Sequence, residues 1–529
     1  MSPPAQHDVV ILGGGLAGLC LALQLRRRFA DLDIVVLERK AHPVPAAAHK
    51  VGESTVEIGA QYFAETLGLR AHLDAEHIRK FGFRFFWSEG REDLAGVTEL
   101  GVSQVMPTPT WQIDRGVFEN HLGVRARELG VRFIDGASVR GVSFGEGQAA
   151  HAVRARVGGE DREFTARWVV DASGRAGLLK RTLGLAEANG HDVNSVWFRI
   201  DARLAIDDWC DDRAWGARCA PPERWRSTNH LCGEGYWVWL IPLGSGAHSV
   251  GIVCDAGLHP LERMNTFDKA LDWLREFQPL VARHCEATRD KLMDFLFLRG
   301  FSYGCRQVFS GDRWALTGEA GVFLDPFYSP GSDFIAIANT YICELIAHDR
   351  AGQPVAPYAR LYEQLYLSFY ENTLSLYRDQ YAIFGDAEIM AIKVIWDYAY
   401  YWGILCPLFF QDRLADLGLL GDLRDDMLAA AALNRDMQAL LRRWYAHGTR
   451  ASRPVMWDQG KLDWFLAMNT ALRDRLDGAG TRARVREGLA TLRDLAATIR
   501  VRVGVHAHGI ASTVDAAVPG TLPLFASAA

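Results

Sequence analysis

The chain has 529 residues, of which 49 % are hydrophobic, 11 % aromatic and 23 % charged, a composition typical of a folded globular protein. This length exceeds what a single hydrophobic core usually supports, so we expect two or more packed subdomains. A formal net charge of −6 disfavours nucleic-acid binding, and the nine cysteines include no Cys-x-x-Cys pair, so we expect neither a disulfide framework nor a metal site.

The sequence carries no pattern that predicts export or membrane insertion. Its N-terminal residues lack the basic region and the apolar run of a signal peptide. The densest apolar stretch, residues 398–410, is too short to span a bilayer and is interrupted by Pro407, which favours a buried helix. We therefore expect a cytoplasmic protein without a transmembrane segment.

The N-terminal segment predicts a strand, a helix and a second strand, the arrangement of a βαβ unit. Residues 8–12 are apolar and β-branched, residues 16–29 carry apolar side chains at helical spacing, and residues 34–37 form a second strand-like run. Strands then dominate between about 190 and 315, and helices after about 335. We therefore expect an α/β fold that begins with a Rossmann-like domain and ends in a helical region.

A glycine cluster between the first predicted strand and helix fits the pattern G-x-G-x-x-G, with Gly13, Gly15 and Gly18 at the defining positions. The first glycine allows a tight turn, the second lets the backbone approach a pyrophosphate, and the third lets helix and strand pack closely. Glu38 closes the second strand, where its carboxylate can accept hydrogen bonds from a ribose diol. The pattern predicts a dinucleotide site and does not by itself distinguish FAD from NAD.

Three later segments resemble the FAD-binding motifs of flavoproteins. The segment around Arg115 is similar to the one whose arginine contacts the FAD linker, and the turn with Asp171 and Gly174 is similar to the strand-turn motif that follows it. Residues 314–326, which include Asp325, resemble the motif that closes over the ribityl chain and pyrophosphate, with Glu319 standing where an Asp is usual. Because the chain has only one dinucleotide fingerprint, we expect FAD and no separate NAD(P)H-binding domain.

Residues 237–242 match W-x-W-x-I-P, the signature of flavin-dependent halogenases, and the chain resembles that family over residues 6–345. The matching side chains are Trp237, Trp239, Ile241 and Pro242. The segment 51–55 contributes Glu53 and Ser54, which the resemblance assigns to the cofactor. The alternative is a core strand with two indoles on one face, since positions i and i+2 point the same way.

The resemblance implies that FADH2 and oxygen oxidise chloride or bromide to hypohalous acid, which then travels to a separate substrate pocket. The indoles of Trp237 and Trp239 are expected to keep the organic substrate away from the flavin. Lys80 matches the family's catalytic lysine, which holds the electrophilic halogen, and burial among neighbouring phenylalanines would lower its pKa. A solvated surface lysine is the alternative, and Lys50 is a weaker competitor for the catalytic role.

Residues 325–331 align with the family's halide-binding turn, in which we expect Ser329, Pro330 and Gly331 to form the halide site. Tyr328 stands where halogenases of free tryptophan carry a glutamate, which favours a phenol or pyrrole substrate, often tethered to a carrier protein. Pro330 has no N–H to offer a halide, whereas Ser329 and Gly331 can still donate. Asp333 would repel a halide if its carboxylate faced the site.

The resemblance implies a Rossmann-like FAD-binding domain of the flavoprotein monooxygenase type over residues 1–190 and 300–345, and a mixed β-sheet substrate domain over 191–299. A helical C-terminal region over 346–510 and a tail over 511–529 complete the chain. The helical region is rich in aromatic residues, which predict core packing more than a substrate box, although it is the candidate lid over an aromatic substrate.

The predicted activity is FADH2- and O2-dependent halogenation of a phenol, a pyrrole or a related electron-rich ring, with FADH2 supplied by a separate NAD(P)H-dependent flavin reductase. Two alternatives stay open. The first is an FAD monooxygenase or other oxidoreductase that acts without halide, and the second is a non-catalytic FAD-binding partner in a biosynthetic complex. Histidines such as His230 have neither a triad-like nor a metal-like setting in the sequence and receive no role.

Overall fold

The computed structural model describes residues 6–46, 51–448, 451–507 and 522–526, so Lys50 and most of the 511–529 tail lie outside the described residues. The chain forms two compact units. The first contains residues 1–76, 113–191 and 302–371, and the second contains 77–112, 192–301 and 372–529. Residues 77–112, which the sequence placed in the FAD-binding domain, therefore belong to the second unit, as do the helices after residue 372.

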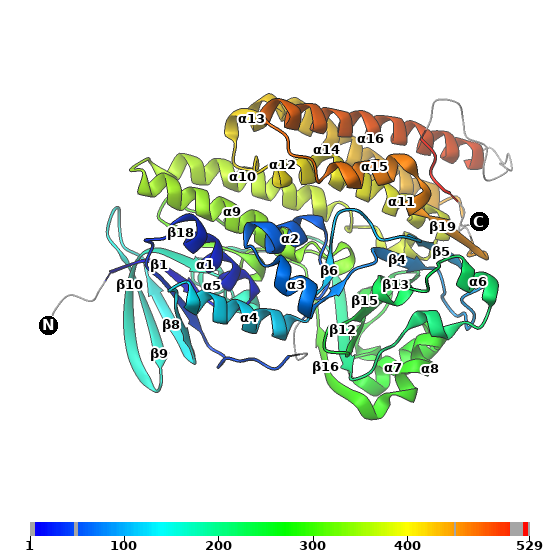
Figure 1. Cartoon of the computed structure of the whole chain (residues 1–529), viewed down its shortest axis with the longest axis horizontal. Coiled ribbons are helices and arrows are strands. Elements are labelled where there is room, and N and C mark those ends of the chain that lie inside the picture. The colour runs from blue at the N-terminus through cyan, green and yellow to red at the C-terminus, as the bar shows by residue number, and fades with distance from the viewer. Residues whose placement is uncertain (1–5, 47–50, 449–450, 508–521, 527–529) are drawn as a thin grey trace. The chain divides into compact units, whose positions relative to one another are not determined.

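The sheet of the first unit is a mixed sheet built on the predicted βαβ element. Four of its pairings are parallel and two are antiparallel. Its strands, in spatial order, are β7 Arg132–Asp135, β2 Ile34–Glu38, β1 Gln6–Leu12, β10 Glu160–Asp171, β9 His151–Val157 and β8 Ala137–Ser143, with β18 Trp314–Leu316 paired to β10 (Figure 1). The residues of β1 and β2 are nearly all buried, as expected for strands covered on both faces, so the α/β fold class is confirmed.

Helices pack around this sheet and bring distant segments together. Helix α1 Leu16–Arg28 contacts both α4 Arg115–Glu128 and α9 Gly331–Arg350. A short helical pair, α2 Glu57–Gln61 and the π-helix Tyr62–Thr66, is followed by α3 Arg70–Glu76, and α2 packs against α9. The remaining elements of this unit are α5 Leu178–Thr182, β11 Ala186–Glu187, β17 Gly304–Cys305 and most of α10 Val355–Leu374.

The second unit is organised by an eight-stranded sheet. In spatial order its strands are β16 Leu292–Leu298, β12 Val193–Ile200, β15 His248–Asp255, β14 Tyr236–Pro242, β13 Thr228–Gly233, β4 Phe83–Phe86, β5 Thr98–Gly101 and β19 Val455–Asp458. β3 Ile78–Arg79 pairs with β6 Trp111–Gln112 beside it. The pattern after residue 335 was expected to be almost wholly helical, so β19 is a difference, and it forms because it pairs in parallel with β5 from far earlier in the chain.

The two faces of this sheet have different roles because side chains alternate along each strand. Tyr236, Val238 and Leu240 of β14 enter a hydrophobic core that also contains residues of α7 Phe267–Phe277 and α8 Pro279–Ala287. Trp237 and Trp239 of the same strand are buried but are not members of that core. The two indoles therefore point to the face of the sheet opposite α7 and α8.

The C-terminal helices of the second unit form a separate layer of packed elements. They are α11 Ala387–Tyr400, the π-helix Tyr401–Leu405, α12 Cys406–Phe410, α13 Leu417–Asp422, α14 Arg424–Tyr445, α15 Asp463–Ala471 and α16 Gly478–Ala507. Helix α16 packs against α11, α14 and the π-helix. Across the part of the chain that the structure describes, none of the helices combines the length and the apolar composition that crossing a bilayer demands.

A glycine on β15 makes room for one of the two indoles. A Cβ atom at Gly251 would lie 2.2 Å from the indole ring of Trp239, far inside van der Waals contact. The indole N–H of Trp239 donates to the Oγ of Ser249, which also lies on β15, at 3.1 Å. The ring is therefore fixed over β15. The position of Trp239 therefore depends on the absence of a side chain at residue 251.

We expect Gly251→Ala to destabilise the protein by about 1–3 kcal/mol, because the added methyl group must displace a packed indole. The measurement is the free energy of unfolding in urea, followed by tryptophan fluorescence. Gly216→Ala is the control, since a Cβ atom at Gly216 in α6 Arg213–Ala217 would meet no atom within 4 Å. Equal stability of the two variants would show that the indole of Trp239 moves freely.

Candidate active site

The glycine turn of the first unit has a backbone that only glycine tolerates at two positions. Gly13 has φ +112°, and a Cβ atom there would lie 2.4 Å from the carbonyl oxygen of Ala172. A Cβ atom at Gly18 would lie 2.0 Å from the carbonyl oxygen of Gly13. Gly15 caps the N-terminus of α1, and no other atom of the described chain lies within 4 Å of where its Cβ would be. The turn therefore offers open space and a helix N-terminus to a pyrophosphate, which fits a dinucleotide.

Glu38 holds this turn in place. Its Oε2 accepts a hydrogen bond from the Gly14 N–H at 2.7 Å, and its Oε1 accepts one from the Lys40 N–H at 2.7 Å. A carboxylate has about four lone-pair positions, so both oxygens can still accept a ribose hydroxyl. The ribose contact of Glu38 stays a prediction.

Two further predicted cofactor segments contact one another in the first unit. The guanidinium of Arg115 donates to the carbonyl oxygen of Val51 at 2.6 Å and to Glu119 at 2.7 Å. The N–H of Ile113 donates to the carbonyl oxygen of Glu53 at 2.5 Å, and Glu53 and Ser54 are both buried. The segment that carries Arg115 and the segment 51–55 therefore form a single structural unit, as a shared cofactor site requires.

Asp171 stabilises a turn through its own side chain. Its two carboxylate oxygens accept hydrogen bonds from the N–H groups of Ser173 at 2.9 Å and Leu179 at 2.7 Å, and burial raises the pKa of this carboxyl. Gly174 follows with φ +62°. The carboxylate of Glu319 pairs with Arg175 at 3.0 Å, so the residue that replaces the usual Asp joins two of the predicted cofactor motifs.

Asp325 is buried and engaged on both carboxylate oxygens. Oδ1 accepts from the Phe327 N–H at 2.9 Å and caps the short 3-10 helix Pro326–Tyr328. Oδ2 lies 2.8 Å from His191 Nε2, and His191 is also buried. His191 could not be found from the sequence, because His191 and Asp325 are far apart in the chain and no local pattern links them.

The predicted halide turn has a defined set of remaining donors. Ser329 has φ +54°, and its N–H donates to the carbonyl oxygen of Pro326 at 2.9 Å. Pro330 caps the N-terminus of α9, so the amides of the first turn, which have no carbonyl acceptor within the helix, begin at Gly331. The expectation that Ser329 offers its N–H to a halide is therefore corrected, because that group closes the 3-10 turn.

Asp333 lies in the first turn of α9, and its carboxylate has a partner on another helix. Its Oδ1 accepts a hydrogen bond from the N–H of Gly59 in α2 at 2.8 Å, and the side chain is buried. A carboxylate in the first turn of a helix is stabilised by the helix dipole. Asp333 therefore ties α9 to α2.

Lys80 belongs to the second unit and is buried, with 3 % of its surface exposed. Its N–H donates to the carbonyl oxygen of Thr110 at 2.9 Å, and its Nζ lies 3.4 Å from the ring centroid of Phe83 on β4. This environment is unlike that of the solvated surface lysine that the sequence left as an alternative. The catalytic role of Lys80 stays a prediction.

The sheet face that bears the two indoles continues across three strands as a row of rings. Phe85 of β4 pairs with His230 of β13, which pairs in turn with Trp239 of β14. The ring centroid of His230 lies 5.2 Å from that of Phe83, 4.5 Å from that of Phe85 and 5.3 Å from that of Trp237. His230 therefore lies between the ring that covers Lys80 and the first indole of the W-x-W-x-I-P segment, a position that the sequence did not reveal.

Hydrogen bonds fix the rings of this face. His230 Nδ1 donates to the carbonyl oxygen of Arg84 at 3.2 Å, and the indole N–H of Trp237 donates to the hydroxyl of Tyr381 at 2.9 Å. The two indole centroids are 5.6 Å apart. Ile241 and Pro242 complete β14 and pair with Ser249 and His248 of β15. The indoles are thus held in fixed positions rather than exposed as a mobile surface.

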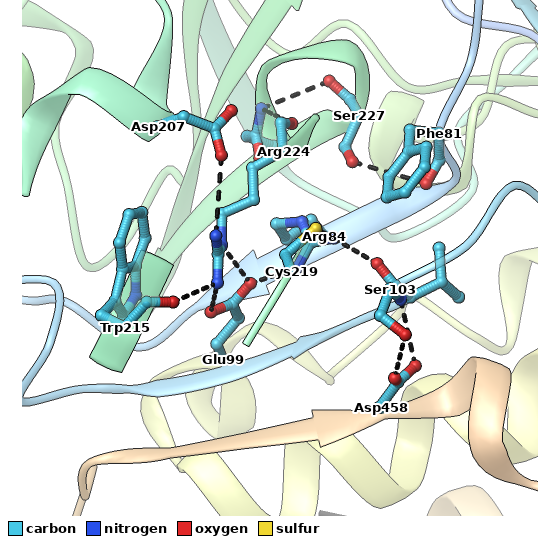
Figure 2. A network of polar contacts seen from close by, with 12 residues as sticks. Phe81, Arg84, Glu99, Ser103, Asp207, Trp215, Cys219, Arg224, Ser227 and Asp458 are labelled. Atoms are coloured by element: carbon cyan, nitrogen blue, oxygen red, sulfur yellow. Dashed lines mark hydrogen bonds and ion pairs between the residues drawn. The ribbon is translucent and has the colours of Figure 1, made fainter. Parts of the chain in front are cut away.

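An ionic network centred on the fully buried side chains of Arg84, Glu99 and Arg224 lies beside the Lys80 segment (Figure 2). The carboxylate of Glu99 pairs with the guanidinium of Arg84 and, at 2.9 Å, with that of Arg224. Arg224 also donates to the carbonyl oxygen of Trp215 at 2.9 Å and lies 3.6 Å from Asp207. Two cations therefore face two carboxylates, and the buried charges balance.

This network holds the backbone on both sides of Lys80. Arg224 begins the 3-10 helix Arg224–Arg226, and the carbonyl oxygen of Arg226 accepts from the Phe81 N–H at 3.2 Å. The guanidinium of Arg226 donates to the carbonyl oxygen of Arg79 at 3.1 Å. The chain directly before and directly after Lys80 is thus fastened to the segment that Arg224 anchors.

The comparisons with known proteins agree with this arrangement. A family model described as an FAD binding domain matches residues 6–270, half of the chain, so the chain belongs to that family of flavoproteins. Among curated relatives, a flavin-dependent halogenase of Dictyostelium discoideum is 25 % identical over 434 residues, which cover 76 % of this chain and 70 % of that protein. The predicted resemblance to flavin-dependent halogenases is confirmed.

A second relative supports the same assignment, and a solved structure shows the same fold. A brominase of pyrrole-2-carbonyl peptidyl-carrier protein from Pseudoalteromonas luteoviolacea is 28 % identical over 341 residues, covering 63 % of this chain and 75 % of the relative. The solved structure of halogenase PltM with phloroglucinol and FAD aligns with a TM-score of 0.66 at 17 % identity, covering 93 % of this chain and 97 % of that one. The structural likeness shows a shared fold.

We expect Glu99→Gln to destabilise the protein by about 3–5 kcal/mol, because it removes one carboxylate from a buried set of balanced charges. Urea unfolding measures the change. Glu262→Gln is the matched control, since Glu262 pairs with Arg299 at the exposed surface and should show no measurable change. A Glu99→Gln protein as stable as the control would mean that the buried network adds nothing to stability.

We expect Gly18→Ala to lower the amount of bound FAD by about tenfold or more, because a methyl group 2.0 Å from the Gly13 carbonyl oxygen must push α1 away from the turn. The visible absorbance of the purified protein reports bound flavin. Gly421→Ala, whose Cβ would meet no atom within 4 Å, should keep its flavin. Full flavin content in Gly18→Ala would place the cofactor elsewhere.

Proposed function

We propose that this protein is an FADH2- and O2-dependent halogenase of an electron-rich aromatic ring, a phenol, a pyrrole or a related compound, with Lys80 as the catalytic residue. The observation that carries the proposal is the buried amine of Lys80 on the sheet face that also bears Trp237 and Trp239. A monooxygenase whose substrate meets the flavin directly has no need of such an amine.

Each part of the site has a proposed task. FAD, when bound and reduced, supplies the chemistry that converts O2 and halide into hypohalous acid. The amides of the α9 N-terminus, beginning at Gly331, hold the halide. The indoles of Trp237 and Trp239 exclude the organic substrate from the flavin, and Lys80 Nζ hydrogen-bonds the hypohalous acid, or carries the halogen as a haloamine, against the ring carbon.

The substrate class is supported by the relatives and by one residue of the turn. The relatives include a brominase and a chlorinase of carrier-bound pyrrole-2-carbonyl groups and a tetracycline 7-halogenase. Tyr328 in the turn cannot act as the glutamate that assists halogenation of free tryptophan. A phenol or pyrrole is already electron-rich and needs no such base.

We also propose that FADH2 comes from a separate flavin reductase and that the protein works in the cytoplasm. The chain carries only one dinucleotide fingerprint, which its FAD-binding fold uses. All nine cysteines are free thiols, as is usual in a reducing compartment.

The test is a halide competition assay by mass spectrometry, with purified protein, FAD, a flavin reductase, NADH, bromide and chloride. The substrates are phloroglucinol, simple phenols, indoles and a pyrrole-2-carboxyl group loaded on a carrier protein. A product with a halogen isotope pattern supports the proposal. An oxygenated product that forms equally without halide would move the protein to the monooxygenases.

In the same assay, we expect Lys80→Met to lower product formation by about 100-fold or more, while consumption of FADH2 continues, because the lysine acts after the halide has been oxidised. Lys291→Met, which alters an exposed lysine of the same unit, should keep full activity. Halogenation by Lys80→Met at the wild-type rate would remove the lysine from the mechanism.

A further inference from the structure

The C-terminal helices of the second unit contact the ring that covers Lys80. Phe83 lies under Lys80 Nζ at 3.4 Å, and its ring centroid is 6.0 Å from that of Tyr398 near the end of α11. Tyr398 is partly exposed, whereas most of its neighbours on α11 are buried. An accessible aromatic ring thus lies one side chain away from the catalytic amine.

Tyr398 belongs to a compact group of three aromatic rings. Its centroid lies 4.7 Å from that of Trp402, and Phe465 of α15 lies 5.5 Å from Tyr398 and 4.6 Å from Trp402. We call Tyr398, Trp402 and Phe465 the aromatic trio. Aromatic rings at these separations attract one another, and a planar ring placed against them gains the same contact.

Trp402 lies in a short π-helix that packs against α16. This π-helix, Tyr401–Leu405, is a local widening that is frequent at functional sites. The next residue, Gly403, packs directly on α16, where a Cβ atom at Gly488 would lie 2.3 Å from the Gly403 carbonyl oxygen. This contact of two glycines lets the π-helix lie close to α16.

The indole N–H of Trp402 has no hydrogen-bond partner among the described residues, although the side chain is only 3 % exposed. A buried donor without an acceptor costs about 1–3 kcal/mol, a cost that a ligand oxygen would remove. Trp273 has the same deficiency but packs among Tyr236, His259 and Phe277 in the core on the α7 side of the sheet. Unlike Trp273, Trp402 lies near Lys80, because its ring contacts Tyr398 and the ring of Tyr398 lies against Phe83.

We propose that the aromatic trio binds the ring that is halogenated, with the ring against Tyr398 and an oxygen of the substrate accepting the N–H of Trp402. The ligand is a planar, electron-rich ring that carries a hydroxyl or carbonyl oxygen, such as a phenol or an acylated pyrrole. This inference rests on the proposed function, because it takes Lys80 as the point from which the halogen is delivered. Trp402 is then a specificity-determining residue, since a ring without an oxygen leaves its N–H unpaired.

The test compares Trp402→Phe with Trp273→Phe in the full-length, FAD-loaded protein, with phloroglucinol as the probe. Each change keeps a ring and removes an unpartnered N–H. Calorimetry should show about tenfold weaker binding of phloroglucinol to Trp402→Phe and unchanged binding to Trp273→Phe, the size of effect that one lost hydrogen bond gives. The KM for phloroglucinol should rise by the same factor while kcat stays within about twofold.

A second pair of variants examines the stacking contact. Tyr398→Phe keeps the ring and should bind phloroglucinol nearly as the wild type does, whereas Tyr398→Leu should weaken binding by about five- to tenfold. Wild-type protein that binds phloroglucinol no more tightly than Trp402→Phe, or equal losses in Trp402→Phe and Trp273→Phe, would overturn the inference.

A further assay traps hypohalous acid with a chemical scavenger in the same preparations. It distinguishes a failure of this inference from a failure of the proposed function. Wild type and Trp402→Phe should release equal amounts, because Trp402 acts on the organic substrate alone. If the wild type forms no hypohalous acid, the proposed function fails, whatever phloroglucinol binding shows. If the acid forms and the variants bind phloroglucinol as the wild type does, the inference fails and the proposed function stands.

Discussion

The second unit depends on the alternation of side chains along β14. Tyr236, Val238 and Leu240 of this strand enter the hydrophobic core with α7 and α8, and the residues between them point to the opposite face. A shift of register by one residue would exchange the two sets and place the indoles in the core. The burial of Tyr236, Val238 and Leu240 therefore fixes which face of the sheet carries Trp237 and Trp239.

The buried ionic network also fixes part of the second unit, in this case the backbone around Lys80. Glu99 faces two arginines in a place that water does not reach, where an unpaired charge would be very costly. The network joins β4, β5 and the 3-10 helix before β13, and that helix bonds to the backbone around Lys80. The network thereby restricts where the segment that carries Lys80, the proposed catalytic residue, can lie.

Much of this molecule could be predicted from the sequence, and the remainder has a common physical cause. The βαβ unit, the strained glycines and the shared face of the two indoles follow from local periodicity and from the steric freedom of glycine. The pairing of His191 with Asp325, the position of His230 and the closure of the turn at Ser329 depend on residues that meet only after folding. Periodicity describes which face a side chain takes, but it does not describe which distant residue it meets.

The strand β19 has a consequence for the way the chain is made. Thr98–Gly101 of β5 lies beside Val455–Asp458 in parallel, so the last strand of this sheet is supplied by residues synthesised more than three hundred positions later. Loop closure over such a separation is slow, and until it happens β5 presents an unpaired edge to other chains. During synthesis on the ribosome, the sheet beside Lys80 therefore stays incomplete until nearly the whole chain has emerged, and a chaperone that shields β5 in that interval would protect the nascent protein from aggregation.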